Sequence, residues 1–132
     1  MPLRLRPGQD LREALLSEVA TRGCTAAFVL GGIGSLSHAT LRLAGAAVPQ
    51  VLSGDIELLT LSGTLAADGR GVHLHACLAT ADGSVLGGHL GRGCVVRTTA
   101  EILLVGLPGW SFRREPDPQT GFDELVVKTG NP

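Results

Sequence analysis

The spacing of apolar residues changes near residue 23 of the chain. Before that point Leu11, Leu15 and Val19 recur every four residues, as on one face of an α-helix. Asp10 and Glu13 stand at capping-box spacing, with Asp in the place of the usual Ser or Thr. Arg22-Gly23 has the cation and the glycine typical of a helix end. The pattern predicts one helix over residues 10–22.

Beyond the helix, apolar residues alternate with polar ones or form short runs between glycine-rich joints, which predicts strands. Gly31-Gly-Ile-Gly-Ser35 is expected to be a turn, and because no helix follows it, a phosphate-binding loop is not expected. Residues 110–120, polar and rich in turn residues, are expected to form a surface loop or an arm that packs on a neighbour. The predicted strands cover residues 24–30, 39–43, 55–65, 72–79, 85–96, 98–107 and 122–128.

These elements predict a single α+β domain over residues 1–132. It would hold a mainly antiparallel sheet of six or seven strands and one N-terminal helix. No second helix of crossover length is visible, which excludes a doubly wound parallel sheet.

Composition adds an expectation of self-association. Of the 132 residues, 44% are apolar and only 17% are charged, and the mean hydropathy is +0.27. These values are high for a soluble monomer of this size, so we expect apolar surface to be buried against another subunit. No membrane segment or secretion signal is visible. The three cysteines form no Cys-x-x-Cys pair, which favours reduced thiols and a cytoplasmic location.

The charge balance bears on nucleic-acid binding. Eleven Lys and Arg against twelve Asp and Glu give a net charge of -1. DNA binding by this chain alone is therefore not expected, because bulk electrostatics would not hold phosphates.

The most informative stretch is Val72-His-Leu-His-Ala-Cys-Leu78. Side chains two apart on a strand share a face, so His73 and His75 point away from the apolar positions between them. Their Cα atoms would lie about 6.6 Å apart, close enough for both imidazoles to bind one ion. A solvated polar strand face is the plainer alternative for this pair.

Whether His89 joins them depends on the turn within Thr80-Ala-Asp-Gly-Ser84. A two-residue Asp-Gly loop would place His89 opposite Ala76, on the wrong face. A three-residue loop over residues 81–83 pairs His75 with His89 and brings the three histidines together. A bulge at Gly87-Gly88 could also re-aim His89 from the shorter loop.

Three neutral imidazoles would leave a fourth position on the ion for water or a ligand. Zinc is the first choice of divalent metal, and the same ligands also suit nickel, copper and iron. His38 is expected to lie on the surface. Glu57 and Glu101 lie in apolar strand runs and are each expected to have a partner, such as Arg42, Arg97 or backbone amides. A metal-bound water beside such a carboxylate would permit hydrolysis or hydration.

An ordered set of short motifs identifies a family resemblance over nearly the whole chain. The sequence resembles the PPC domain, the "plants and prokaryotes conserved" domain. The motifs are Arg6-Pro-Gly-Gln-Asp-Leu11, Gly32-Ile-Gly-Ser-Leu36 with Leu41-Arg42, Asp55-Ile-Glu-Leu58 with Leu61-Ser-Gly-Thr64, His73-Leu-His75, Asp82-Gly83, Gly87-Gly-His89, Thr99-Ala-Glu101 and Thr120-Gly-Phe-Asp-Glu-Leu125.

The resemblance implies an α+β fold assembled as a homotrimer. In plants the domain follows AT-hook segments in nuclear transcription regulators, and the Arg-Gly-Arg-Pro core of such a hook is absent here. The histidines make this chain similar to bacterial and archaeal members that contain metal, which implies His73, His75 and His89 as ligands.

The resulting expectation is a small trimeric metal-binding domain that acts as a binding or regulatory module, linked to transcription through partners. Its partners would be its own copies and a protein or small-molecule ligand. The alternatives are a metal-dependent enzyme with an open three-histidine site and a DNA-associated regulator.

Overall fold

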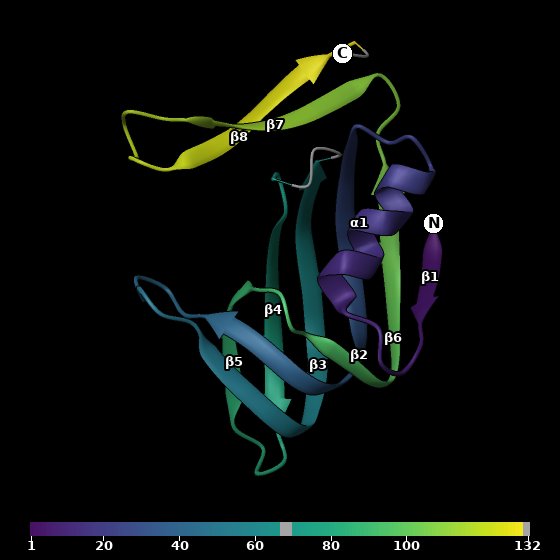
Figure 1. Cartoon of the computed structure of the whole chain (residues 1–132), viewed down its shortest axis with the longest axis vertical. Helices are drawn as coiled ribbons and strands as arrows, with labels where there is room; N and C mark the ends of the chain where they lie inside the picture. The colour runs from purple at the N-terminus through teal and green to yellow at the C-terminus, as the bar shows by residue number, and fades with distance from the viewer. Residues whose placement is uncertain (67–69, 131–132) are drawn as a thin grey trace.

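The computed structural model describes residues 1–66 and 70–130, which form eight β-strands and one α-helix (Figure 1). The described strand pairs are all antiparallel, so the predicted class is confirmed. In chain order the elements are β1 (Pro2–Leu5), α1 (Leu11–Thr21), β2 (Ala26–Arg42), β3 (Gln50–Ala66), β4 (His73–Thr80), β5 (Val85–Leu90), β6 (Val95–Gly106), β7 (Trp110–Pro116) and β8 (Asp123–Thr129).

Six strands form one sheet in the order β1-β6-β2-β3-β4-β5, and β7 and β8 form a separate hairpin. The strand β5 also pairs with the end of β2, where Leu41 lies opposite Leu90 and Arg42 opposite His89. This second pairing curls one end of the sheet toward closure, as Figure 1 shows for β2, β4 and β5. It brings the end of β2 beside the predicted metal ligand on β5.

The predicted helix is confirmed and spans Leu11–Thr21. Asp10 caps it, accepting a hydrogen bond from the Glu13 backbone N–H at 3.0 Å. At the other end the Gly23 N–H donates to the carbonyl of Ala20. The helix packs its apolar face on the sheet, where Leu11, Leu15 and Val19 are fully buried.

The turn predicted at Gly31–Ser35 is wrong. Residues 26–42 form one continuous strand, which pairs with β3 on one side and β6 on the other. Register shifts at three places in the β2–β6 pairing, between Val29 and His38, take up the irregular backbone within the sheet. The glycines therefore serve as bulge and close-packing positions in a long strand, because bulges bend a strand without ending it.

The main sheet has six strands, within the predicted six or seven, and the hairpin adds two more. Two of the eight strands were not predicted, and the predicted strands 24–30 and 39–43 are parts of one strand, β2. Strand β1 precedes the helix and pairs with β6. Residues 110–116, predicted as part of a loop or arm, form β7 and pair with β8 from Trp110 opposite Thr129 to Pro116 opposite Asp123. Their polar composition hid an alternation in which Phe112 is buried and Arg113 is exposed. The predicted strands 85–96 and 98–107 are divided differently, with β5 ending at Leu90 and β6 beginning at Val95.

Apolar clusters lie on both faces of the sheet. The larger contains the helix residues and the inward-facing side chains of β2, β3, β4 and β6. The smaller joins Ala26 and Ala66 to Phe112 of β7, whose ring packs edge-on against Phe28 at 5.5 Å. It fastens the β7–β8 hairpin to the face of the sheet opposite the main core.

The described helix is too short to cross a bilayer, and no other described segment is a candidate membrane-spanning helix.

Candidate metal centre

The predicted alternation along β4 is confirmed. Leu74, Ala76 and Leu78 are buried in the main core. His73 and His75 point the other way, toward the outer face, where His73 is half-buried and His75 is exposed. Because His73 lies opposite Thr64 on β3, it sits at the edge of the region covered by the β7–β8 hairpin.

The β4–β5 turn has the three-residue form. Thr80 pairs with Ser84 through an N–H···O bond of 2.9 Å, and Gly83 has a φ of 84°, in the left-handed region. The Asp82 carboxylate accepts the Ser84 N–H at 3.0 Å and fixes the turn. The Thr80 hydroxyl also donates a hydrogen bond to the Asp82 carboxylate. The pKa of Asp82 is lowered chiefly by this bond and next by the bond from the Ser84 N–H.

This turn places His89 directly opposite His75. The two-residue loop is therefore wrong for this hairpin. No register shift interrupts the β4–β5 pairing, so a bulge at Gly87-Gly88 is not what aims His89.

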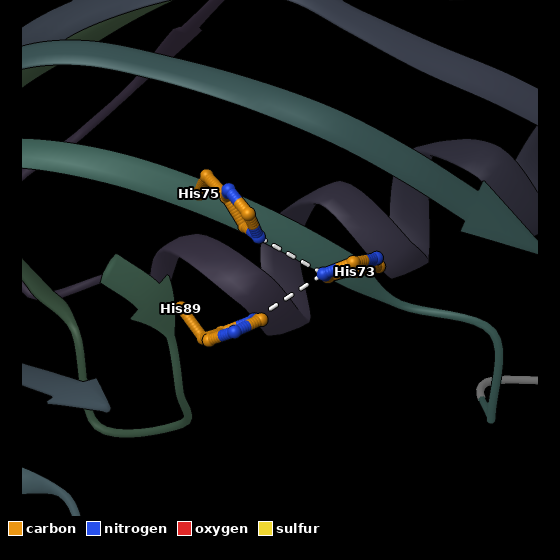
Figure 2. Close-up of side chains that lie close together, drawn as sticks. All are labelled: His73, His75 and His89. Carbon is orange, nitrogen blue, oxygen red and sulfur yellow. Dashed lines mark hydrogen bonds between the residues drawn. The ribbon is translucent and has the colours of Figure 1, made fainter. Parts of the chain in front are cut away.

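The three imidazoles converge (Figure 2). His73 Nε2 lies 2.9 Å from His75 Nε2 and 3.2 Å from His89 Nδ1, and the three ligand nitrogens all fall within 4.8 Å of one another. A tetrahedral ion with Zn–N bonds of 2.0–2.1 Å separates its ligand nitrogens by about 3.3 Å. The observed spacing is close to that value for two of the three pairs.

One nitrogen takes part in both short contacts. His73 Nε2 carries either one proton or one lone pair, so it cannot make two good linear hydrogen bonds at once. A cation between the rings would accept a lone pair from each. The donor set therefore fits a metal ion better than it fits a hydrogen-bonded network.

The electrostatics of the site favour neutral rings. Burial lowers the pKa of His73, and the nearby Arg114 and the other two histidines lower it further. Burial also lowers the pKa of His89, followed by the charge of Arg42. Neutral imidazole is the form that binds metal.

The remaining predicted candidates lie elsewhere. His38 is exposed, as expected, and its ring Nδ1 lies 3.1 Å from the hydroxyl of its neighbour Ser37. Among the described residues, His73, His75 and His89 form the one group of three or more potential ligands close enough to share an ion.

Within residues 1–66 and 70–130, Glu57 and Glu101 form none of the ion pairs expected with Arg42 or Arg97. Both side chains lie on exposed positions between buried neighbours, so water solvates them and no partner is required. Arg97 instead pairs with Asp55 at 2.7 Å, and both are well exposed.

A groove of about 1290 Å³ adjoins the histidines, and sequence reasoning did not predict it. His73 and His89 form part of its wall. It is bounded by α1, the ends of β2 and β5, and the β7–β8 hairpin, which contributes Arg114 and Glu124. The Arg113-Arg114 doublet is a sequence feature that could have pointed to a basic groove, but of the two residues Arg114 lines it and Arg113 does not.

Comparisons with known proteins agree with this fold. A family model described as the Plants and Prokaryotes Conserved (PCC) domain matches residues 1–108. The Bifunctional protein GlmU of Synechococcus sp. (strain JA-2-3B'a(2-13)) is 50% identical over 127 residues, covering 96% of this chain and 20% of that protein. The chain thus spans about a fifth of the length of the curated relatives it matches.

Solved structures extend the likeness to three dimensions. A hypothetical protein from Salmonella cholerae-suis has a TM-score of 0.92 and 39% identity, with 98% of this chain and 92% of that chain covered. A metal-containing protein from Archaeoglobus fulgidus has a TM-score of 0.74 and 26% identity, with coverages of 96% and 91%. With a family model matched over most of its length, this chain belongs to the Plants and Prokaryotes Conserved domain family.

Proposed function

We propose that the chain is a metal-binding module that holds one divalent cation on His73, His75 and His89. The convergence of the three ligand nitrogens carries this proposal, because isolated surface histidines have no reason to face one another at 2.9 and 3.2 Å. The metal in the Archaeoglobus fulgidus relative supports it.

Zinc is the proposed metal. Three neutral imidazole nitrogens suit Zn²⁺, which has no geometric preference from d-electrons and binds imidazole well. Three protein ligands leave a fourth position that can take water or a small ligand. An open position of this kind is typical of exchangeable sites and not of closed structural ones.

Metal analysis of protein purified without a histidine tag tests this function. We expect about one equivalent of zinc per chain after extensive dialysis, and its loss on treatment with a chelator. Absence of any bound transition metal, together with failure of the metal-free protein to take up added zinc at micromolar concentration, would overturn the proposal.

We propose further that the module assembles as a homotrimer. The outer face of β2 and β6 exposes Leu30, Ile33 and Leu103, at 61%, 56% and 45% of their areas. A shallow depression of about 530 Å³ lies over the same strands and β1. Exposed apolar side chains on adjacent strands support burial against other copies. Light scattering tests the assembly.

A binding or regulatory role is favoured over catalysis. A similar sequence forms about a fifth of the longer Synechococcus protein, which supports use as a module. The free cysteines Cys24, Cys77 and Cys94 support a cytoplasmic setting for it. A link to transcription would run through partners of the trimer.

One observation favours a second candidate, a metal-dependent hydrolase or hydratase. Glu124 lines the same groove as His73 and lies close enough for its charge to act on that ring. A carboxylate near a metal-bound water could serve as a general base. Against this, the Glu124 carboxylate lies 3.9 Å from the Arg114 guanidinium, so it faces a cation of the protein as well as the histidines. A screen of zinc-loaded protein against activated esters and phosphoesters, with Glu124→Gln as the comparison, decides between the two.

A further inference from the structure

The groove beside the histidines gathers half of the arginines in the chain. Ten arginines occur in the sequence, and five of them line the groove: Arg12, Arg42, Arg70, Arg92 and Arg114. They come from α1, the end of β2, the segment before β4, the β5–β6 connection and β7. Only the fold brings these positions together.

The local charge is opposite in sign to that of the whole molecule. Among the described residues of the lining, five guanidinium groups face the carboxylates of Asp123 and Glu124, which is a balance of +3 within that part of the chain. The chain as a whole carries -1. A concave surface with one excess sign of charge concentrates ions of the other sign.

Four of these arginines, Arg12, Arg42, Arg92 and Arg114, have no close and buried carboxylate partner in the part of the chain that the structure describes. Among the described residues, no acidic side chain lies within 4 Å of the Arg12 or Arg42 guanidinium. The Arg92–Glu13 pair, at 3.5 Å, is exposed to solvent, and the Arg114–Glu124 pair is at the long limit of 3.9 Å. Exposed or long ion pairs of this kind are weak, so both guanidinium groups can still bind an anion.

Two of the arginines, Arg12 and Arg114, are also half-buried. The Arg114 side chain is only 12% exposed, and its Nη2 donates to the Thr64 hydroxyl at 3.2 Å. Arg12 Nε is buried without a hydrogen-bond partner. Burial lowers the pKa of Arg12, as does the charge of Arg92. An oxyanion between partly desolvated guanidinium groups would stabilise them, and it would supply the acceptor that Arg12 Nε lacks.

From this cluster we infer that the groove is a binding site for a small polyanionic molecule that carries phosphate or carboxylate groups. Arginine forks bind both kinds of oxyanion in bidentate fashion. Apolar side chains in the same lining, Val72, Leu74 and Phe122 among them, leave room for an organic portion. The arginines alone would bind the oxyanion, so this inference does not depend on a metal. A ligand in the groove would also lie next to His73 and His89, which line it.

The geometry favours a small molecule over a DNA duplex. Arg114 lies recessed beneath the β7–β8 hairpin, against Thr64 of the sheet, where a rigid backbone cannot reach it. Asp123 and Glu124 stand on the hairpin side of the groove, where they would repel a long run of phosphates. The five arginines surround a hollow and do not form an extended stripe.

Calorimetric titration of the untagged chain tests the inference, with pyrophosphate and citrate as separate probes at 0.15 M salt. Each titration uses metal-free protein, so that the probes cannot act by binding or removing a metal. We expect at least one probe to bind with a Kd below about 1 mM, and the tighter of the two to identify the preferred oxyanion. Failure of both to bind would overturn the proposal.

Substitutions locate the binding. Arg42→Gln, at an exposed position, should weaken the tighter probe about ten-fold or more, and Arg12→Gln should do likewise. Arg113→Gln is the matched control, because this neighbour of Arg114 loses the same charge outside the groove, and it should leave affinity within two-fold. Equal affinity in the Arg42, Arg12 and Arg113 variants would overturn the site.

Two further arms separate this inference from the metal proposal and from nucleic acid. Metal-free His75→Ala protein should keep its affinity for the probe. A wild type that binds the probe but takes up no zinc would overturn the metal site alone. Loss of anion binding in the His75→Ala variant would overturn the arginine groove. A 20-base-pair duplex that competes with the probe at micromolar concentration and 0.15 M salt would replace the small molecule with DNA as the occupant.

Discussion

His75 and His89 lie directly opposite each other on β4 and β5, with ring centroids 4.5 Å apart. The pairing depends on a turn of three residues, because a hairpin register shifted by one would turn His89 to the other face of the sheet. The candidate metal centre is thus set by a local feature, the turn at residues 81–83, together with the alternation of β4.

The turn itself is open to test at Gly83. Its φ of 84° is costly for a side chain with a Cβ, and a Cβ there would meet nothing within 4 Å. We expect Gly83→Ala to lower the free energy of unfolding by about 1 kcal/mol from backbone strain alone. Gly83→Asn should lose less, because Asn tolerates the left-handed region. Urea denaturation measures both, and an Ala variant as stable as the wild type would contradict the turn type.

Gly63 allows β3 to pass close behind His73. At φ 146°, a Cβ on this residue would lie 2.0 Å from the His73 carbonyl oxygen. Gly63→Ala should therefore lower the free energy of unfolding by at least about 2 kcal/mol, from overpacking and strain together. It should also weaken zinc binding by moving β4.

Gly31→Ala is the matched control for this substitution, since a Cβ at that strand position meets nothing within 4 Å. Its free energy of unfolding should remain within about 0.5 kcal/mol of the wild type. Thermal or urea unfolding measures both variants. If Gly31→Ala loses as much stability as Gly63→Ala, the close approach at Gly63 is not the cause of the loss.

Metal binding should depend on pH in a defined direction. Because the pKa values of His73 and His89 are lowered from 6.5, both rings stay neutral somewhat below that pH. We expect zinc affinity to be nearly constant above pH 6.5 and to fall steeply below about pH 6. Competition with a chromogenic chelator follows this change, and affinity that persists unchanged to pH 5 would argue against histidine ligands.

The metal-free protein should show the matching effect on stability. A histidine whose pKa is lower in the folded state takes up its proton more readily when unfolded. Stability is therefore fully present at pH values well above 6.5 and falls as the pH drops through 6.5 toward the lowered values. Urea denaturation at a series of pH values measures the free energy of unfolding. A free energy that does not change between pH 7 and pH 5 would contradict the lowered pKa values of the two rings.

The proposed trimer predicts that a charge on the outer face of the sheet prevents assembly. Ile33→Lys combined with Leu103→Lys should shift the mass measured by light scattering toward the monomer, because lysine cannot be buried there unpaired. Val48→Lys is the control, an exposed apolar residue at 75% in the β2–β3 connection. A wild-type chain that is monomeric at micromolar concentration would contradict the trimer.

The helix and the histidine site could be predicted because their determinants are close in sequence. Asp10 and the spacing of Leu11, Leu15 and Val19 define the helix. A loop of three residues, one of the alternatives that the sequence allows, places His89 opposite His75. The continuity of β2 could not be predicted in this way. Its glycines have the composition of a turn, and only pairing with β3 and β6 on both sides keeps those residues in the sheet.

The groove escaped prediction for a related reason. Arg12, Arg42 and Arg114 belong to elements far apart in the chain, and they meet only once the sheet has curled and the β7–β8 hairpin has folded onto it. The net charge of the sequence argued against binding of phosphates. Because it is summed over the whole chain, it does not reveal a local cluster of arginines. Phe112, which fastens the hairpin, stands in a stretch whose polar residues indicated a loop.

The most direct test of the three-histidine site is the zinc content of untagged protein, measured by mass spectrometry for the wild type, His75→Ala and His38→Ala. We predict about one equivalent of zinc in the wild type and in His38→Ala, whose histidine is exposed and outside the site. His75→Ala should retain less than about a tenth, since two imidazoles hold an ion far less tightly than three, while its circular dichroism spectrum stays that of the folded wild type. Equal zinc in a folded His75→Ala protein and in the wild type would contradict the account.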